Sequence, residues 1–224
     1  MKILIATKNK GKYGEIAGFL AGVPGLEVVF LGDYEVEDED FVEDGETHEE
    51  NAYKKASYYF DKLVREIGHD FDYVVGEDSG IYVEALADEL GVETRRWGAG
   101  HDATDEEWLE YFMKEMEVRT GLVANGGSEA GRGAKFVCNA CLVGPGSSGV
   151  GIGELLREHF EGETPGVIVG EIASEVLPGL PLSSVFLADG AEEVYSMLGR
   201  EKKNEISHRG QAVAKLKEYL TLLS

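Results

Sequence analysis

Short apolar runs alternate with amphipathic stretches along the first third of the chain. The apolar residues 2–6 predict a strand, and residues 12–22, whose apolar side chains recur at helical spacing, predict a helix. A second strand is expected over 26–31 and a long helix over 47–67, with an acidic loop at 32–45 between them. Strands mixed with helices of this length predict an α/β fold.

The rest of the chain continues this pattern less regularly. Thr104 is expected to cap a helix through Trp108, Phe112 and Met116, with Glu107 completing a capping box. The other expected elements are a buried strand at 72–75 that ends at 76–80, a strand at 134–143 between glycine-rich surface loops at 126–127 and 144–149, β-structure and turns over 150–186, a short helix at 194–198, and a last helix that begins at Ser207.

Composition describes a globular chain with a strongly acidic surface. Its 224 residues, 43% of them hydrophobic, are enough to bury a core in one domain or two small lobes. No apolar stretch approaches the length of a membrane helix, and the N-terminal run is too short for a signal peptide, which predicts a cytoplasmic protein. The net charge of −22 argues against binding to nucleic acid or to an anionic membrane.

Three lysines, Lys8, Lys10 and Lys12, lie in the loop between the first predicted strand and the first predicted helix. Backbone N–H groups at a helix start are unsatisfied and carry partial positive charge, which Lys12 would reinforce. This loop therefore predicts a site for a polyphosphate. The alternative is a solvated turn that carries ordinary surface lysines.

Two acidic clusters could carry chemistry. Glu77 and Asp78 follow the predicted strand at 72–75, so they are expected at its carboxyl end, where open α/β sheets bind ligands. The cluster at 43–46 precedes the long helix, and clusters of carboxylates suit Mg²⁺. An acidic turn and a solvated loop are the alternatives, and the nearby His48 is expected to be incidental.

The segment 203–210 is the sharpest local pattern. Ser207 is expected to be the N-cap of the last helix, which places His208 and Arg209 in its first turn. A cation there opposes the helix dipole, so the pattern indicates that an anionic or planar group is bound nearby.

Cys138 and Cys141 form a C-x-x-C pair within a predicted strand. Residues three apart in a strand point to opposite faces, and no second pair with suitable spacing supplies two more zinc ligands. Buried structural cysteines are therefore expected.

Taken in order, these blocks resemble the inosine triphosphate pyrophosphatase family over nearly the whole chain. The resemblance rests on Thr7-x-Asn9-x-x-Lys12-x-x-Glu15, on Glu50-Asn51-Ala52-x-x-Lys55-Ala56, on Asp78-Ser79-Gly80 with Glu77 in place of an Asp, on Arg96-Trp97, on Lys135-Phe136-Val137-Cys138, and on Lys203-x-x-Ile206-Ser207-His208-Arg209-Gly210.

The resemblance implies a mixed α/β fold in which helices flank an elongated central sheet, with two lobes, an active cleft between them, and one domain over 1–224. It implies an Mg²⁺-dependent pyrophosphatase that cleaves deaminated purine nucleoside triphosphates, such as ITP, dITP and XTP, to the monophosphate and pyrophosphate. The family is typically dimeric, so a homodimer is expected.

Residue roles follow from the same resemblance. Asp78 is expected to be the general base and a metal ligand, and Glu43 the second metal ligand. The residues expected to bind the nucleotide are Thr7, Asn9, Lys12, Ser79, Arg96, Lys203, His208 and Arg209.

One segment departs from the family pattern. Where the family carries G-F-G-Y-D-P, this chain has residues 179–184, which lack both the stacking aromatic residue and the aspartate of base recognition. Ser183 and Ser184 are expected to replace the lost base contact. The alternatives are the same reaction on a pyrimidine or another modified nucleotide, and a nucleotide-binding protein that has lost catalysis.

Overall fold

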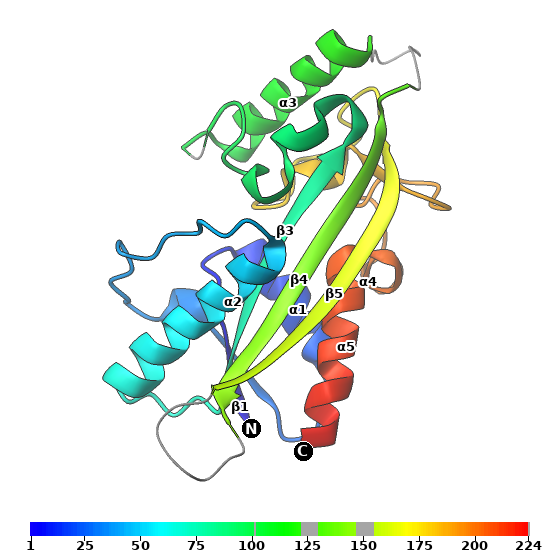
Figure 1. The fold of residues 1–224 in the computed structure, drawn as a ribbon. Coiled ribbons are helices and arrows are strands. Elements are labelled where there is room, and N and C mark those ends of the chain that lie inside the picture. The colour runs from blue at the N-terminus through cyan, green and yellow to red at the C-terminus, as the bar shows by residue number, and fades with distance from the viewer. Residues whose placement is uncertain (101, 122–129, 147–154, 224) are drawn as a thin grey trace. The chain divides into compact units, whose positions relative to one another are not determined.

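The computed structural model describes residues 1–100, 102–121, 130–146 and 155–223, and its fold is the predicted mixed α/β type with helices flanking a sheet (Figure 1). The sheet has the strand order β2-β1-β3-β4-β5-β6. The strands are β1 (Lys2–Ile5), β2 (Glu27–Phe30), β3 (Tyr73–Val83), β4 (Gly133–Pro145), β5 (Leu155–Ile168) and β6 (Phe186–Ala188), and the helices are α1 (Lys10–Leu20), α2 (His48–Tyr59), α3 (Asp105–Thr120), α4 (Arg200–Ile206) and α5 (His208–Leu223).

The chain forms two compact units, each made of several segments. Unit 1 comprises Met1–Asp78, Cys138–Gly162 and Arg209–Ser224, and unit 2 comprises Ser79–Val137 and Glu163–His208. The chain passes from one unit to the other within β3, β4 and β5, and again at the start of α5. A single domain over 1–224 and an active cleft between the lobes stay predictions.

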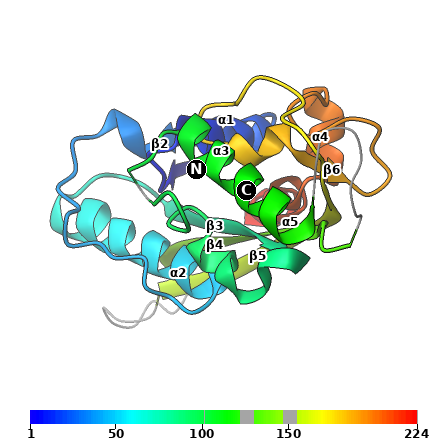
Figure 2. The same ribbon diagram turned by 90° about the horizontal axis from the view of Figure 1, so that it is seen from above.

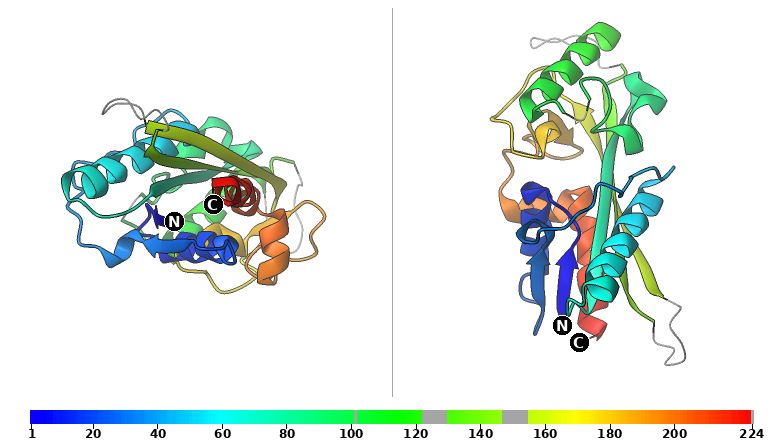
Figure 3. Two further views of the ribbon diagram at one scale, coloured as in Figure 1. Left: turned by 90° about the horizontal axis from the view of Figure 1, so that it is seen from below. Right: turned by 90° about the vertical axis from the view of Figure 1, so that its left-hand side faces the viewer.

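Unit 1 has an apolar layer on each face of its sheet. β1 pairs in parallel with β2 and with the first residues of β3. Alternate residues of β1 point to opposite faces: Leu4 packs with α2 residues such as Ala52 and Ala56, and Ile3 packs with α1 and α5 residues such as Ile16 and Leu216. Figures 1 and 3 show α2 on one face and α1 with α5 on the other.

Unit 2 is organised around α3, which faces the reader in Figure 2. Trp108, Phe112 and Met116 are buried in its core, as their helical spacing predicts. The expected capping box is present, because Thr104 accepts a hydrogen bond from the Glu107 backbone and the Glu107 side chain accepts one from the Thr104 backbone.

The predicted end of the third strand is wrong. β3 does not stop before Gly76 but continues to Val83, so Glu77 and Asp78 lie within the strand and not in a turn after it. β1 pairs with β3 only as far as Val75, whereas β3 keeps its place in the sheet beside β4. The two carboxylates therefore lie just beyond the end of β1, on a strand whose alternation sends them to opposite faces.

Two helix predictions also need correction. The long helix predicted over 47–67 is α-helical only to Tyr59 and continues as a π-helix over Phe60–Glu66. Residues 194–198 contain a turn instead of a short helix, because two of their N–H groups bond to other segments: Tyr195 donates to the Phe186 carbonyl at 3.0 Å and Ser196 to the Ser183 carbonyl at 2.9 Å. The short polar helix α4 follows, and it lacks the apolar periodicity that would have predicted it.

The two cysteines are free and buried on β4, as expected. Cys141 packs in the apolar cluster on the α2 face, and Cys138 lies 3.4 Å from the Glu77 carboxylate. Of the predicted glycine-rich loops, residues 126–127 and 147–149 lie outside the described residues. Within the described part of the chain, no helix is both long enough and apolar enough to cross a membrane.

Candidate active site

Alternation along β3 separates the two candidate carboxylates. Val75 belongs to the apolar cluster on the α1 and α5 face, and Glu77 points the same way. Val74 belongs to the cluster on the α2 face, and Asp78 points there. Between them, Gly76 lets α2 approach β3 closely, since a Cβ at this position would lie 2.1 Å from the Ala52 carbonyl oxygen.

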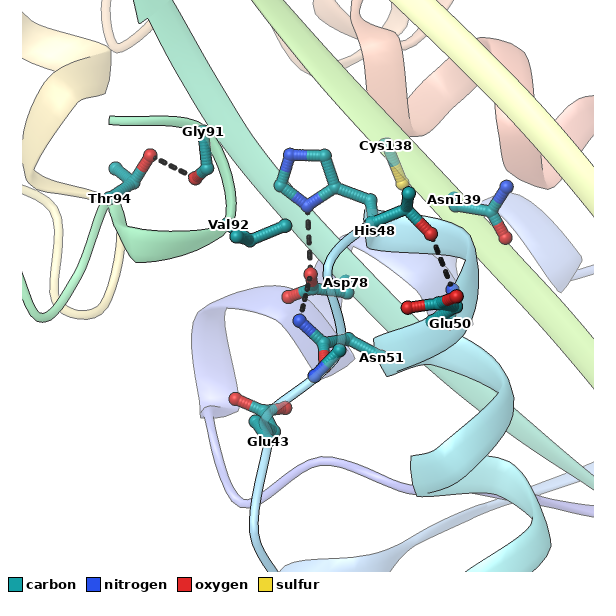
Figure 4. Close-up of polar contacts among 12 residues, drawn as sticks. Glu43, His48, Glu50, Asn51, Asp78, Gly91, Val92, Thr94, Cys138 and Asn139 are labelled. Atoms are coloured by element: carbon teal, nitrogen blue, oxygen red, sulfur yellow. Dashed lines mark hydrogen bonds and ion pairs between the residues drawn. The ribbon is translucent and has the colours of Figure 1, made fainter. Parts of the chain in front are cut away.

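Asp78 is held by the first turn of α2 (Figure 4). The Thr47 side chain caps this helix by accepting a hydrogen bond from the Glu50 N–H, 3.1 Å away. His48 and Asn51, three residues apart, therefore share the face that looks onto β3. The His48 Nδ1 lies 2.8 Å and the Asn51 Nδ2 3.3 Å from the same oxygen of Asp78, Oδ2.

The environment of Asp78 keeps its carboxyl group ionised. Burial raises its pKa, but the hydrogen bond from His48 and the positive charges of Lys55 and Lys12 outweigh burial and leave the pKa below its ordinary value. Asp78 is therefore a buried anion at neutral pH, which is the state that a metal ligand or a general base requires.

Glu43, the other predicted metal ligand, lies on the loop before α2 (Figure 4) and forms an ion pair with Lys55. Lys55 also donates a hydrogen bond to the Glu77 carbonyl oxygen at 3.0 Å, which ties the Glu43 loop to β3 next to Asp78. No hydrogen bond or ion pair within the described chain joins Glu43 directly to Asp78.

The carboxylates of Asp78 and Glu43 suit Mg²⁺ better than they suit a metal whose ligands all come from the protein. No group of three or more His, Cys, Asp or Glu side chains among the described residues is arranged to hold a metal. Mg²⁺, however, commonly takes one or two carboxylates and completes its coordination with water and substrate phosphates. Asp78 and Glu43 supply carboxylates of this kind.

Glu77 lies on the other face and is surrounded by cations. Its Oε2 is 2.9 Å from the Lys12 Nζ, and its Oε1 accepts from the Arg209 Nε at 3.2 Å and Nη2 at 3.1 Å. Arg209 also pairs with Glu15. The Glu77 side chain is 1% exposed, and although burial raises its pKa, Lys12 and Arg209 hold the pKa well below its ordinary value.

The predicted phosphate loop is shorter than expected, because α1 begins at Lys10 and places Lys10 and Lys12 in the first turn of the helix instead of in the loop before it. The Asn9 side chain caps α1 by accepting from the Lys12 N–H at 3.0 Å, and the Thr7 hydroxyl accepts from the Asn9 N–H at 3.1 Å. The side chain of Lys12 is 20% exposed and paired with Glu77, so it is not an ordinary surface lysine. Lys8, in contrast, is 54% exposed and pairs with Asp38.

The C-terminal motif divides between the two units. Ser207 has extended backbone angles (φ −76°, ψ 146°) directly before α5, as an N-cap residue requires, and Arg209 follows in unit 1. The sequence indicated that Arg209 at this helix start has an anionic partner nearby. The protein itself supplies two such partners, Glu15 and Glu77. His208 lies in unit 2, where its ring stacks on Phe136 with centroids 4.6 Å apart.

The remaining predicted ligands also lie in unit 2. The Lys203 Nζ is 5.8 Å from the centre of the Tyr195 ring, which stacks at 6.2 Å from His208. Arg96 forms a bidentate ion pair with Glu93, and both N···O distances are 2.8 Å. Ser79 lies in β3, and Ser183 is buried in a 3₁₀ turn.

Two residues of the Asp78 site were not singled out from the sequence. His48 was expected to be incidental, and it is within hydrogen-bond distance of the predicted catalytic carboxylate. Asn51 was noted only as part of a motif. The signal that could have found them is spacing, because positions 48, 51 and 55 lie on one face of a helix whose start is marked by Thr47.

Comparisons with known proteins agree with the predicted family. A model described as the Ham1 family matches residues 3–219. The dITP/XTP pyrophosphatase of Caldanaerobacter subterraneus is 34% identical over 98% of this chain and 96% of its own, and that of Geobacter sulfurreducens is 33% identical over 98% and 96%. A HAM1 protein from Coxiella burnetii matches the structure with a TM-score of 0.74 and 25% identity over 99% of both chains.

Proposed function

Because the chain belongs to the Ham1 family, we propose that it hydrolyses deaminated purine nucleoside triphosphates, such as dITP, ITP and XTP, to the monophosphate and pyrophosphate. The relatives named dITP/XTP pyrophosphatase, which align over nearly their whole length, support this reaction. The structural observation that supports the proposal most strongly is that Asp78 is a buried, ionised carboxylate within hydrogen-bond distance of His48 and Asn51.

In this mechanism Asp78 accepts a proton from the water that attacks the phosphate chain. A carboxylate can do this efficiently only when it is ionised and positioned, and the contacts from α2 provide both conditions. Mg²⁺, held by Asp78 and Glu43, would offset phosphate charge and lower the pKa of the attacking water.

The phosphates would bind at the start of α1, where the Thr7–Lys12 segment presents backbone N–H groups and Lys12. Lys12 and Arg209 are matched by the carboxylates of Glu77 and Glu15, so these four side chains carry no net charge. A triphosphate therefore competes with Glu77 for Lys12. Because these side chains leave no net positive charge for the phosphates, Mg²⁺ would supply it, which is one physical reason for a role of the metal in binding.

The two serines predicted to replace the lost base contact differ in the hydrogen bonds that their hydroxyl groups make. Ser184 is fully buried and its hydroxyl donates to the Pro181 carbonyl oxygen at 2.8 Å, so this hydroxyl is already committed within the turn. The Ser183 hydroxyl makes no hydrogen bond with any residue of the described chain. Ser183 is therefore the better candidate for a base contact, and Leu182 belongs to the apolar core.

The test is release of pyrophosphate from a panel of ITP, dITP, XTP, dUTP and the standard nucleoside triphosphates, each with Mg²⁺ and with EDTA. We expect turnover of ITP, dITP and XTP that EDTA abolishes. Turnover of a different base would mean that the altered 179–184 segment has changed the substrate. Triphosphate binding without turnover would reject the proposed reaction in favour of a binding protein.

The homodimer and the cytoplasmic location remain predictions from the resemblance and the composition. Sedimentation analysis of the purified protein tests the first of these.

A further inference from the structure

Two donors converge on one oxygen of Asp78, and this asymmetry has a consequence for the chemistry. His48 and Asn51 both contact Oδ2, at 2.8 and 3.3 Å (Figure 4). No described residue donates a hydrogen bond to the other oxygen, Oδ1. The protein therefore occupies one side of the carboxylate and leaves the other oxygen to a ligand or water.

The contacts to Oδ2 are built into the packing of α2 on β3. His48 is 6% and Asn51 1% exposed, so neither contact is a mobile surface interaction. The close approach that Gly76 permits brings this turn of α2 within reach of the strand. A hydrogen bond between buried groups is costly to break, because each group would lose its partner without gaining water.

Asn51 also connects Asp78 to the loop that carries Glu43. Its side-chain oxygen accepts a hydrogen bond from the Gly45 N–H at 2.8 Å, and its nitrogen faces Asp78. Gly45 allows this contact, since a Cβ there would lie 2.5 Å from the Asn51 oxygen. One amide group thus fixes both the carboxylate and the backbone two residues after Glu43.

We propose that His48 and Asn51 are positioning residues: together they hold Asp78 through Oδ2 and leave Oδ1 for the attacking water and the metal. This inference rests on the proposed hydrolysis. Neither side chain needs to touch the nucleotide, because each acts through Asp78. Partners of this kind, which orient a metal-binding carboxylate, change metal affinity or activity about 10- to 100-fold when they are removed.

The central experiment compares His48→Phe with His48→Asn. Phenylalanine retains an aromatic ring but donates nothing to Asp78, whereas asparagine offers an amide nitrogen near the position of the imidazole Nδ1. We expect His48→Phe to lower kcat about 10- to 100-fold with little change in KM, and to weaken Mn²⁺ binding in the absence of nucleotide, measured by electron paramagnetic resonance. We expect His48→Asn to restore most of both properties.

The matched control is His69→Phe, the same substitution at a histidine whose ring packs against Tyr34 and Phe71 in unit 1. It should leave kcat and Mn²⁺ affinity unchanged. Asn51→Leu provides a second test that does not depend on the fold of the His48 variant, and it should show the same loss of kcat and Mn²⁺ affinity.

The outcomes separate this inference from the proposed function. Wild-type protein that hydrolyses no nucleotide would reject the function itself. An active wild type together with an equally active His48→Phe variant, or a failure of His48→Asn to restore Mn²⁺ affinity, would overturn the inference alone.

Discussion

Glu77 and Asp78 are neighbours on one strand, yet their surroundings differ completely. Glu77 is paired with two cations and its side chain is 1% exposed. Asp78 is contacted by a histidine and an amide through one oxygen, and its side chain is 11% exposed. The pKa of both carboxyl groups is lowered, by the direct ion pairs with Lys12 and Arg209 for Glu77, and by the hydrogen bond from His48 with the nearby charges of Lys55 and Lys12 for Asp78.

This difference shows how one strand can supply both a structural and a reactive carboxylate. The charge of Glu77 is balanced within the protein, so it stabilises the arrangement of α1 and α5. The charge of Asp78 is only partly balanced, so it remains available to a metal or a proton. Substitutions at the two positions should therefore affect different properties.

The largest effect is expected for Asp78→Asn. We expect kcat to fall about 10³-fold, since loss of a general base commonly costs 10²- to 10⁴-fold, while the thermal unfolding curve changes little. Initial rates of pyrophosphate release and circular dichroism melting test both parts. Activity near that of the wild type would exclude Asp78 as the catalytic residue.

Glu77→Gln should show the opposite pattern. Removing one partner from a buried ion pair typically costs about 3–5 kcal/mol, because Lys12 and Arg209 lose their main counter-ion, so the free energy of unfolding should fall by about that amount. Urea unfolding measures it. The matched control is Glu93→Gln, which breaks the partly exposed pair with Arg96 and should cost less than about 1 kcal/mol.

If Glu77→Gln is as stable as Glu93→Gln, the structural role assigned to Glu77 is wrong.

Thiol labelling provides a smaller and more local effect. Burial raises the pKa of both cysteines, to about 12 for Cys141, so few thiolates form in the native protein. Alkylation should be at least about tenfold slower in the native than in the unfolded protein. Because Cys138 lies 3.4 Å from Glu77, Glu77→Gln should speed the alkylation of Cys138, whereas Asp78→Asn should not. Mass spectrometry of the labelled protein measures both rates.

The smallest effect concerns acid stability. The pKa of Glu77 is lower in the folded protein than its ordinary value of 4.5, so the unfolded chain binds more protons and the contribution of Glu77 to stability is lost as the pH falls below that value. Glu77→Gln removes this titration. Between about pH 5 and pH 3 its unfolding free energy should decline less steeply than that of the wild type, as urea titrations at each pH would reveal.

A decline equally steep in Glu77→Gln and the wild type would show that Glu77 does not contribute to acid unfolding.

Local sequence signals predicted the elements whose causes are local. The capping box of Thr104 and Glu107, the buried stripe of α3 and the extended Ser207 each depend on residues within a few positions of one another. The free buried cysteines followed from the alternation of a strand. The ordered motifs carried the family resemblance, and the Ham1 match over residues 3–219 confirms the family.

Tertiary structure decided the features that depend on distant partners. The sequence by itself determined the α/β class, the acidic surface and the segments that carry chemistry, since these follow from composition and local spacing. It could not show that β3 continues past Gly76, because that depends on its pairing in the sheet. Nor could it separate Glu77, which meets cations 65 and 132 positions away, from Asp78, since only the packed helices on each face determine what each carboxylate contacts.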